Sequence, residues 1–216
     1  MFRQETIKAP ALSRSYEPPM IPLSAAQLSA LADVYAAKGY SVIPQFMSRD
    51  VAAAWELKTR SLPGKKVHVG RDFQTKWLEQ KLPDPSEALD GLGFTDDFVN
   101  LITGVTGLKA IDRNRTRVWI NRYGPGDHVP THCDRAGSTQ FVLCLQGLPE
   151  PEKGGELFIR DEVVPLQTGD AVLFFARGVS HGTLPIGGAS VGRSGFSRVT
   201  CVIRLFALDD PEGASA

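Results

Sequence analysis

The sequence predicts an α+β fold in which a helical first half supports an antiparallel sheet or barrel formed by the second half. Apolar residues recur at helical spacing before about residue 110, whereas short alternating segments separated by Gly, Pro and Asp turns follow from about residue 115. The chain has 216 residues, of which 42% are hydrophobic and 22% charged, which suits one domain with its own core. Helices followed by many short strands are typical of the α+β class.

The expected organisation is a single domain with short terminal extensions. Residues 1–22 contain four prolines and little periodicity, so we expect an extended arm there. Residues 23–208 are expected to form one domain, with helical support over about 23–110 and the barrel core over about 115–207. Residues 209–216 are interpreted as a C-terminal tail.

Start and stop signals delimit two of the expected helices. Ser24, followed three residues later by a glutamine, resembles a capping box, and helical periodicity continues to Gly39, which predicts a helix over about 24–38. Two acidic residues stand at the positive end of a similar segment over about 95–106, and Gly107 closes it. These helices are expected to cover the apolar faces of the strands.

The segment SRDVAAAWELKTR predicts a further helix between these two. Val51, Trp55 and Leu57 or Lys58 are expected on its buried side. The preceding segment YSVIPQF predicts a short strand, whereas SLPGKKVHVGRDFQ, which follows, is too rich in Gly and Lys to be placed.

Strands dominate the second half of the chain. Six segments have strand composition and are separated by turn residues: TRVWINRY, TQFVLCLQ, GELFIRD, EVVPL, DAVLFFA and SRVTCVIRLFAL. Side chains two residues apart share a face of a strand. Two such faces are polar, one in the first strand and one in the last: Arg117, Trp119, Asn121 and Tyr123, and Arg198, Thr200, Val202 and Arg204. We expect these faces to point into the barrel, because a pure packing core would not contain them.

Charge and composition bear on the class of partner and on location. Lys+Arg and Asp+Glu both number 24, so no net basic field favours nucleic acid, although a local basic patch is compatible with that total. The first residues lack the apolar core of a secretory signal, and the longest apolar run, AVLFFA, is too short to span a bilayer. A soluble, cytoplasmic protein without membrane contact is expected, and the sequence does not indicate an oligomeric state.

The three cysteines, Cys133, Cys144 and Cys201, make an odd count whose spacing fits neither a disulfide framework nor a zinc ribbon. All three lie in apolar, strand-like segments. Buried and unreactive thiols are therefore expected at these positions.

Two histidines and one carboxylate in the second half of the chain could form a metal site. His132 and Asp134 are two residues apart, so both project to the same side of an extended backbone while Cys133 points away. His181 follows a predicted strand and could complete the set. Each residue taken alone has an ordinary structural interpretation. Together, two histidines and a carboxylate are typical of non-haem Fe(II) sites, which keep coordination positions open.

The last strand predicts an anion beside this metal. Arg198 and Thr200 stand on its polar face, and a buried arginine requires an anion to offset its desolvation. Arg193 is an alternative anchor that lies nearer to His181 in the sequence. Because Arg193 belongs to the glycine- and serine-rich loop GGASVGRSG, we favour Arg198.

The order of these residues resembles that of the Fe(II)/2-oxoglutarate-dependent dioxygenases. His132-x-Asp134, then His181, then Arg198-x-Thr200 is similar to the family's H-x-D, distal His and R-x-S/T motifs. The resemblance implies a double-stranded β-helix, or jelly-roll, barrel with N-terminal flanking helices. It also implies that the first three residues bind Fe(II), that Arg198 and Thr200 hold the distal carboxylate of 2-oxoglutarate, and that O2 takes the remaining position.

Some segments are similar to the AlkB-type members of this family. Asn121 and Tyr123 reproduce their N-x-Y motif, and Arg198 with Arg204 reproduces their R-x5-R pair. This resemblance makes Asn121, Tyr123 and Arg204 candidate contacts of 2-oxoglutarate. The segments GGELFI and VPLQTGDAVLFF are instead similar to hydroxylases of amino acids or prolyl residues.

Two reactions are therefore expected from the resemblance. The first is hydroxylation of a C–H bond in a small polar metabolite, a free amino acid or a derivative, with release of succinate and CO2. The alternative is AlkB-type demethylation of alkylated nucleic-acid bases. Asp134 favours hydroxylation over halogenation, because related halogenases replace this carboxylate with a small residue. A non-enzymatic barrel with structural zinc would leave Arg198 and Thr200 unexplained.

Three residues are candidate substrate contacts. Arg117 and Trp119 are expected to face inward, although Trp119 could instead fill the barrel mouth and Arg117 could pair with a carboxylate. His128 precedes His132 by four residues, but Pro130 forbids the helix that a zinc pair at this spacing requires. His128 is therefore expected beside the substrate or the metal ligands.

Overall fold

The computed structural model describes residues 23–69, 75–81, 96–148, 154–187 and 197–210. Its helices are α1 (Ala25–Lys38), α2 (Arg49–Thr59) and α4 (Asp96–Thr106). Its strands are β1 (Tyr40–Ile43), β2 (Lys65–Val69), β3 (Thr75–Lys81), β4 (Arg117–Tyr123), β5 (Thr139–Gln146), β6 (Leu157–Ile159), β7 (Glu162–Val164), β8 (Ala171–Phe175), β9 (His181–Thr183) and β10 (Arg198–Leu205). The expected arm 1–22 and Arg193 lie outside the described residues.

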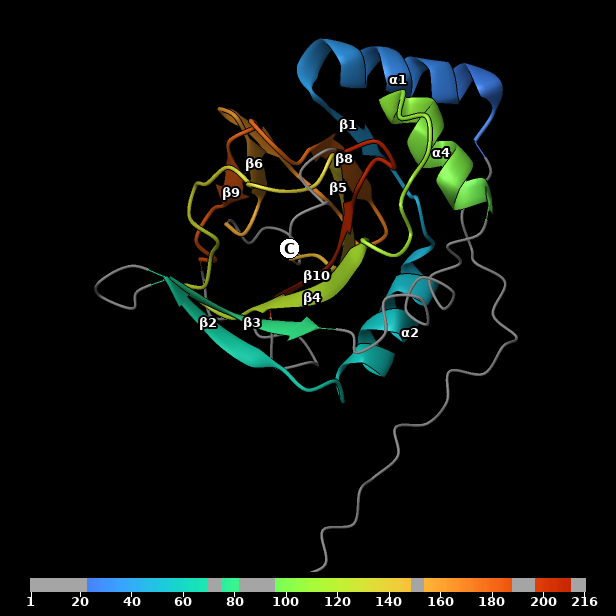
Figure 1. Ribbon diagram of the computed structural model, residues 1–216. Coiled ribbons are helices and arrows are strands. Elements are labelled where there is room, and N and C mark those ends of the chain that lie inside the picture. Colours follow the sequence, from blue (N-terminus) through green and yellow to red (C-terminus); the bar gives the residue numbers. More distant parts are fainter. Residues whose placement is uncertain (1–22, 70–74, 82–95, 149–153, 188–196, 211–216) are drawn as a thin grey trace, which may run out of the picture.

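Two antiparallel sheets of unequal size form the barrel. The larger has the order β1-β8-β5-β10-β4-β3-β2, and the smaller has the order β7-β6-β9. Figure 1 shows the smaller sheet facing the larger one, with the helices on the outer side of the larger sheet. The antiparallel barrel with helices before it agrees with the α+β prediction.

Two hydrophobic cores lie on the two sides of the larger sheet. On its outer side, Ile120 and Ile203 pack in one cluster with helix residues such as Trp55 and Ile102. Between the sheets, a second cluster contains Val142, Val172 and Phe174 of the larger sheet together with Leu157 and Ile159 of the smaller one. The predicted apolar faces of β4 and β10 are therefore covered by the helices, which leaves their polar faces toward the barrel interior.

The capping signals act as the sequence predicts. The Ser24 side chain accepts a hydrogen bond from the Gln27 backbone N–H, and the Gln27 side chain accepts one from the backbone N–H of Ser24. Gly39 ends α1 with φ of 79°, in the left-handed region that favours glycine. Gly107 follows α4 with φ of 72°.

The predicted buried face of α2 is correct at Trp55, which is buried, and Val51 packs partly buried against the core, but it is wrong at Leu57 and Lys58, which are exposed. Leu57 is 61% exposed. The buried residues recur at helical spacing, on a face shifted by about one residue from the predicted one: Ala52, Trp55, Glu56 and Thr59. Glu56 conceals this pattern in the sequence, because a carboxylate is not expected inside. It is buried because it pairs with a cation from the sheet.

That cation is Arg122, whose side chain points from β4 away from the barrel interior. Arg122 is 1% exposed, and its Nη1 lies 2.5 Å from Oε1 of Glu56. Its Nε donates to Gln80 of β3 at 2.5 Å, and its Nη2 donates to the Thr59 hydroxyl at 2.8 Å. These bonds join α2, β3 and β4 at a buried point behind the barrel wall.

Three strands were not placed by the sequence pattern. The strands β2 and β3 form a hairpin, and β3 pairs with β4 in a register that sets Glu79 opposite Asn121. The third is β9, which begins at His181 and pairs with β6. Among the described residues, no helix is long and apolar enough to cross a membrane.

Candidate metal and anion site

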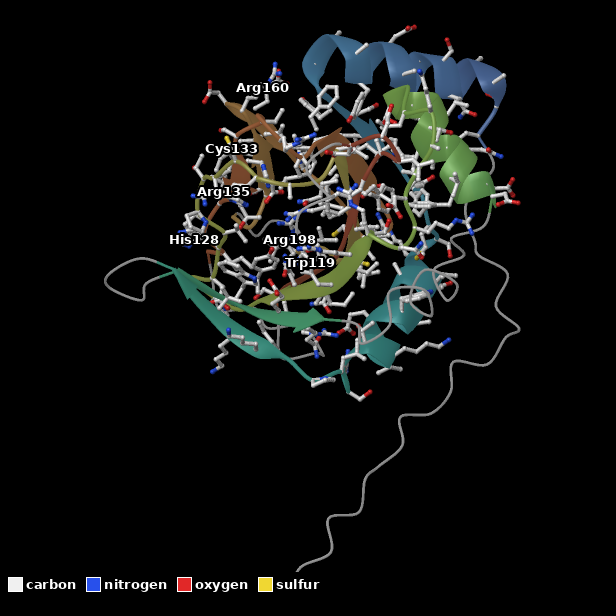
Figure 2. The ribbon with its side chains drawn as sticks, in the orientation of Figure 1. Trp119, His128, Cys133, Arg135, Arg160 and Arg198 are labelled. Carbon is white, nitrogen blue, oxygen red and sulfur yellow. The ribbon has the colours of Figure 1, made fainter. Side chains whose placement is uncertain are left out.

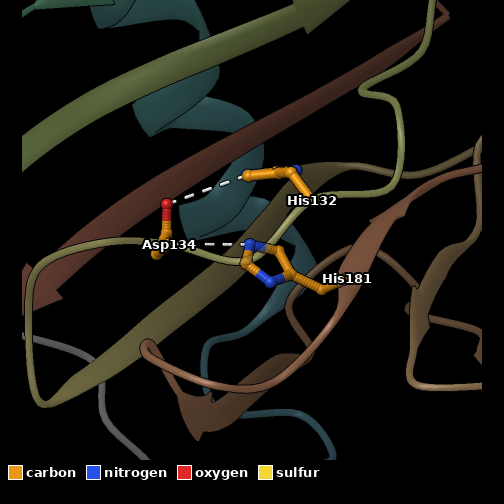
Figure 3. Close-up of side chains that lie close together, drawn as sticks. All are labelled: His132, Asp134 and His181. Carbon is orange, nitrogen blue, oxygen red and sulfur yellow. Dashed lines mark ion pairs between the residues drawn. The ribbon is translucent and has the colours of Figure 1, made fainter.

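His132, Asp134 and His181 come together at the edge of the smaller sheet. His132 and His181 form an isolated antiparallel bridge in which each backbone N–H donates to the other's carbonyl at 2.9 Å. One potential ligand atom from each of the three side chains lies within 4.8 Å of the others. Figure 3 shows both imidazoles directed at the carboxylate, with Nε2 of His132 3.7 Å from Oδ1 and Nε2 of His181 3.6 Å from Oδ2.

Backbone carbonyls fix the tautomers of both histidines. Nδ1 of His132 lies 2.9 Å from the Pro130 carbonyl, and Nδ1 of His181 lies 2.9 Å from the Val179 carbonyl. A carbonyl only accepts hydrogen bonds, so each Nδ1 carries a proton, and Nε2 is the nitrogen that each ring can offer to a metal. Burial lowers the pKa of His181, which favours the neutral form that binds a metal.

The donor set fits a divalent transition metal. Oδ2 of Asp134 is buried and has no hydrogen-bond partner among the described residues. An unpaired buried carboxylate oxygen is costly, and a cation bound between it and the two imidazoles would offset that cost. Two neutral imidazoles and one carboxylate match the facial set of non-haem Fe(II).

Cys133 corrects one sequence expectation. Its thiol is exposed, whereas Cys144 and Cys201 are buried as expected. The same alternation that turns His132 and Asp134 toward the site turns the residue between them outward. Burial raises the pKa of Cys144 to about 11 and that of Cys201 to about 12, so these two thiols are unreactive at neutral pH.

A cavity of about 380 Å³ adjoins the two histidines and extends along the inner faces of β4 and β10. Its wall includes the two histidines and the side chains that the strand alternation predicts to point inward. These are Arg117, Trp119, Asn121 and Tyr123 from β4, and Arg198, Thr200, Val202 and Arg204 from β10. Figure 2 shows Arg198 and Trp119 near the middle of the barrel, with Cys133 and His128 toward its outer side.

Arg198 lies deep in this cavity and is 3% exposed. Its Nη1 donates to the Gly155 carbonyl, and its guanidinium carbon lies 5.8 Å from the centre of the Tyr123 ring. No carboxylate among the described residues forms an ion pair with it. A desolvated guanidinium without a counter-ion favours binding of an anion, and the buried hydroxyl of Thr200 lies on the same face.

Tyr123 and Asn121 extend the polar wall beside Arg198. Burial raises the pKa of Tyr123, so its hydroxyl stays protonated and can donate a hydrogen bond. The side chains of Asn121 and Thr200 act on the same hydroxyl in the opposite direction and lower its pKa, but burial outweighs them. Oδ1 of Asn121 is buried without a hydrogen-bond partner among the described residues, and it is available to a donor in the cavity.

Arg204 contacts a predicted metal ligand. Its Nη2 lies 2.5 Å from Oδ1 of Asp134, and its guanidinium donates to Oε1 of Gln140 on β5 at 3.2 Å and 3.3 Å. Its guanidinium carbon also lies 5.3 Å from the centre of the Trp119 ring. Arg204 therefore lies at the end of the cavity that contains the candidate metal ligands, whereas Arg198 lies six residues away along the same strand.

The three predicted substrate contacts differ in position. Arg117 and Trp119 line the cavity, and Arg117 forms no ion pair with a carboxylate of the described residues. His128 is half-buried with Nδ1 3.3 Å from the Gly126 carbonyl, and it does not line the cavity. A substrate role of His128 stays a prediction without support from this wall.

Sequence reasoning missed several residues of the wall, among them three polar or aromatic side chains. Trp77 and Glu79 reach the cavity from β3, and Gln140 reaches it from β5. The alternation of Trp77 and Glu79 is a strand signal, but it occurs in a polar segment with no apolar face to reveal it. Gln140 belongs to a predicted strand, yet nothing local marks it as a partner of Arg204.

Comparisons with known proteins agree with this architecture. No protein-family profile and no curated protein sequence matches the chain. A prolyl-4-hydroxylase from Pseudomonas putida is 22% identical with a TM-score of 0.64, over 83% of this chain and 98% of that one. A 2OG-Fe(II) oxygenase family oxidoreductase from Burkholderia pseudomallei is 16% identical with a TM-score of 0.66, over 87% of this chain and 94% of that one.

A third similar structure is the non-haem, α-ketoglutarate-dependent epimerase SnoN from nogalamycin biosynthesis. It is 17% identical with a TM-score of 0.64, over 85% of this chain and 84% of that one. Likeness at this level of identity establishes the fold. The chain therefore has the double-stranded β-helix fold of the 2-oxoglutarate- and Fe(II)-dependent oxygenases, with flanking N-terminal helices, as the motif resemblance implied.

Proposed function

We propose that this protein is an Fe(II)- and 2-oxoglutarate-dependent oxygenase that hydroxylates a C–H bond of a small polar metabolite, a free amino acid or a derivative of one. In this proposal His132, Asp134 and His181 hold the iron. Arg198 and Thr200 hold the distal carboxylate of 2-oxoglutarate, with Tyr123, Asn121 and Arg204 lining the same site.

One observation carries the proposal. Two imidazoles that are grouped with a carboxylate, one oxygen of which has no hydrogen-bond partner among the described residues, line the same cavity as a buried arginine that has no carboxylate partner among those residues. A structural zinc site would need neither the open cavity nor the buried cation. A cofactor with a metal-chelating end and an anionic end satisfies both requirements.

The bound iron and 2-oxoglutarate would supply the oxidising chemistry, with succinate and CO2 as co-products. The protein residues would hold the iron, orient the co-substrate and shield both from water. The backbone bonds between His132 and His181 fix the spacing of the two imidazoles, and Arg204 holds Asp134. Arg198 and Tyr123 would set the depth of the co-substrate, because they lie opposite each other in the sheet, six residues along β10 from Arg204.

Anaerobic addition of Fe(II) and 2-oxoglutarate tests the assignment directly. A weak visible charge-transfer band is expected with the native chain and is expected to be absent in His181→Ala. Aerobic incubation with an amino-acid panel should then show substrate-dependent succinate and a product that is heavier by one oxygen atom. A band that survives in His181→Ala would refute the ligand assignment.

The alternative substrate class, alkylated nucleic-acid bases, is tested in the same assay. A methylated oligonucleotide that releases formaldehyde, with binding that weakens as salt rises, would replace the amino-acid proposal. The neutral overall charge and the modest cavity favour a small molecule instead.

A further inference from the structure

Arg117 faces a second arginine across the sheet. In the pairing of β4 with β10, Arg117 lies directly opposite Arg204, and both side chains line the cavity. Two cations in such a cross-strand pair have their Cβ atoms about 5 Å apart and repel each other. Asp134 offsets the charge of Arg204, with which it pairs at 2.5 Å. Arg117 has no carboxylate partner among the described residues, and its guanidinium carbon lies 5.9 Å from the centre of the Phe206 ring.

Two further arginines at this end of the barrel have partners within the fold. Arg177 pairs with the carboxylate of Asp210 at 3.1 Å, and Arg115 donates to the backbone carbonyl of Asp210 at 3.2 Å. Arg115 lies over the same Phe206 ring as Arg117, with its guanidinium carbon 4.5 Å from the ring centre. The arginines of this group outnumber its carboxylates, so the region favours an anion.

The carboxylate of Glu79 is too distant to neutralise Arg117. Glu79 lies opposite Asn121 in the pairing of β3 with β4. Asn121 is four residues from Arg117 on β4, which corresponds to about 13 Å along the strand. Water and salt largely screen an interaction between charges at this separation. An anionic group of a ligand would therefore complement Arg117.

An apolar band separates Arg117 from the proposed site of the distal carboxylate. Trp119, Val202 and Val142 lie opposite one another across β4, β10 and β5, and all three line the cavity. Arg198 lies on one side of this band, and Arg117 lies on the other side, with the candidate metal ligands. A group bound at Arg117 would thus lie near the proposed iron site, and the distal carboxylate of 2-oxoglutarate would keep its own place.

Arg117 is positioned to meet a ligand that arrives from solvent. Its side chain is exposed, whereas Arg198 is 3% exposed. Trp119 is half-buried two residues further along the same face and offers an apolar surface beside the guanidinium. A guanidinium binds a carboxylate through two parallel hydrogen bonds, which an amide or an ester cannot accept in the same way. The pair of side chains therefore suits a free carboxyl group attached to an apolar chain or ring.

We propose that Arg117 is a specificity-determining residue that binds a free carboxylate of the substrate, with the apolar part of the substrate against Trp119. The inference rests on the proposed function and narrows its substrate to molecules that have a free carboxyl group. A free amino acid has this group, and so does an amino acid acylated at its nitrogen. A residue inside a peptide chain lacks it and is excluded as a substrate.

Matched pairs of acid and amide test the proposal on the holoenzyme. Succinate release and product mass are measured with each free amino acid of the panel and with the same amino acid as its carboxamide. The acid is expected to exceed its amide in kcat/KM by about 10- to 100-fold, the value of hydrogen bonds to a charged group. Arg117→Gln should remove this preference by raising the KM for the acid, and Arg117→Lys should restore part of it. The KM for 2-oxoglutarate should stay unchanged in both variants.

Arg113→Gln controls for the loss of one positive charge. The side chain of Arg113 is 52% exposed and pairs with Asp96, and it does not line the cavity. This variant should keep the native preference for the acid. Urea unfolding of Arg117→Gln should match that of the native protein, because the side chain is exposed, so that a raised KM reports recognition and not folding.

Three results would overturn the inference. The first is an amide that is as good a substrate as its acid. The second is a native KM for the acid in Arg117→Gln. The third is a KM for 2-oxoglutarate that rises in Arg117→Gln by the same factor as the KM for the acid, because Arg117 would then bind the co-substrate.

The proposed function is scored separately by the charge-transfer band and by slow succinate release without substrate. If both are present and no free amino acid of the panel stimulates turnover, the inference about Arg117 is wrong and the oxygenase proposal stands. If the band and the background succinate are both absent, both proposals are wrong.

Discussion

Arg204 and Asp134 form an ion pair at the end of the barrel that contains the proposed metal ligands, with Nη2 2.5 Å from Oδ1. Oδ2 of the same carboxylate has no hydrogen-bond partner in the described part of the chain and lies 3.6 Å from Nε2 of His181. The arginine therefore holds one oxygen and leaves the other for a metal. Gln140 holds the arginine in turn, so the position of the carboxylate depends on a chain of contacts from β5 through β10.

Removal of this cation should weaken metal binding. Arg204→Met leaves Asp134 without its orienting partner, and loss of such a contact reduces metal affinity by about 10- to 100-fold. Arg204→Lys keeps the charge and should restore part of the affinity. Titration with Fe(II) or Co(II) under anaerobic conditions measures the effect. Equal affinity of native protein and Arg204→Met would show that the ion pair does not position the ligand.

Gly137 offers an independent way to move the same arginine. A Cβ added there would lie 2.7 Å from Cγ of Arg204, so Gly137→Ala should displace the guanidinium and weaken metal binding. Gly126→Ala is a matched control, because Gly126 also has positive φ, 78° against 95°, but nothing lies within 4 Å of the added Cβ. Both variants should lose about 1 kcal/mol of stability from backbone strain. Only the first is expected to lose metal affinity; loss in both would assign the effect to strain.

Arg198 should lower the stability of the ligand-free protein and strengthen its binding of 2-oxoglutarate. It is 3% exposed without a carboxylate partner among the described residues, and an unpaired buried charge is unfavourable in the absence of ligand. Arg198→Met is therefore expected to keep or raise the free energy of unfolding in urea, and to weaken 2-oxoglutarate binding by about 100-fold. Metal affinity should stay unchanged. A variant that unfolds about 3 kcal/mol more easily would mean that Arg198 acts as a structural residue.

The grouping of the proposed metal and anion residues could be predicted because their signals are local. His132 and Asp134 share a side by simple alternation, and so do Arg198, Thr200 and Arg204 on one strand. The inward faces of β4 and β10 follow from the same rule, which needs no knowledge of the partner strands. The helix ends were equally predictable, because the capping box before α1 and the glycine after it are local signals.

The part of the cavity wall that β3 contributes could not be predicted, because it depends on pairing between distant segments. Glu79 reaches the cavity only because β3 pairs with β4, in a register that local composition does not determine. The buried side of α2 was misjudged for a similar reason. Glu56 is acceptable inside only with Arg122 beside it, and that partner is 66 residues away. His181 begins a strand of three residues, too short to show a period.

Thiol reactivity should distinguish Cys133 from the other two cysteines. It is the exposed thiol, whereas burial raises the pKa of Cys144 to about 11 and that of Cys201 to about 12. A thiol reagent at pH 8 should modify one cysteine in the native protein and three after unfolding in urea. Peptide mass mapping identifies the site. Rapid modification of Cys144 in the folded protein would contradict the burial of β5, and rapid modification of Cys201 would contradict the burial of β10.

The buried pair of Glu56 and Arg122 should make folding sensitive to acid. Burial raises the pKa of Glu56, but hydrogen bonds from Arg60 and Arg122 outweigh burial and lower it below its ordinary value. A lowered pKa in the folded state stabilises the fold above the unfolded-state value of about 4.3, and this stability is lost as pH falls through the folded-state pKa. Glu56→Gln should therefore cost about 3 to 5 kcal/mol at pH 7, because it leaves Arg122 buried without its counter-ion, and the cost should shrink below about pH 4. Urea unfolding at a series of pH values measures the cost at pH 7 and its change with pH. Glu162→Gln is the control: it removes a surface ion pair and is expected to cost about 1 kcal/mol or less. A cost that stays constant from pH 7 to pH 3 would show that Glu56 does not act through its charge.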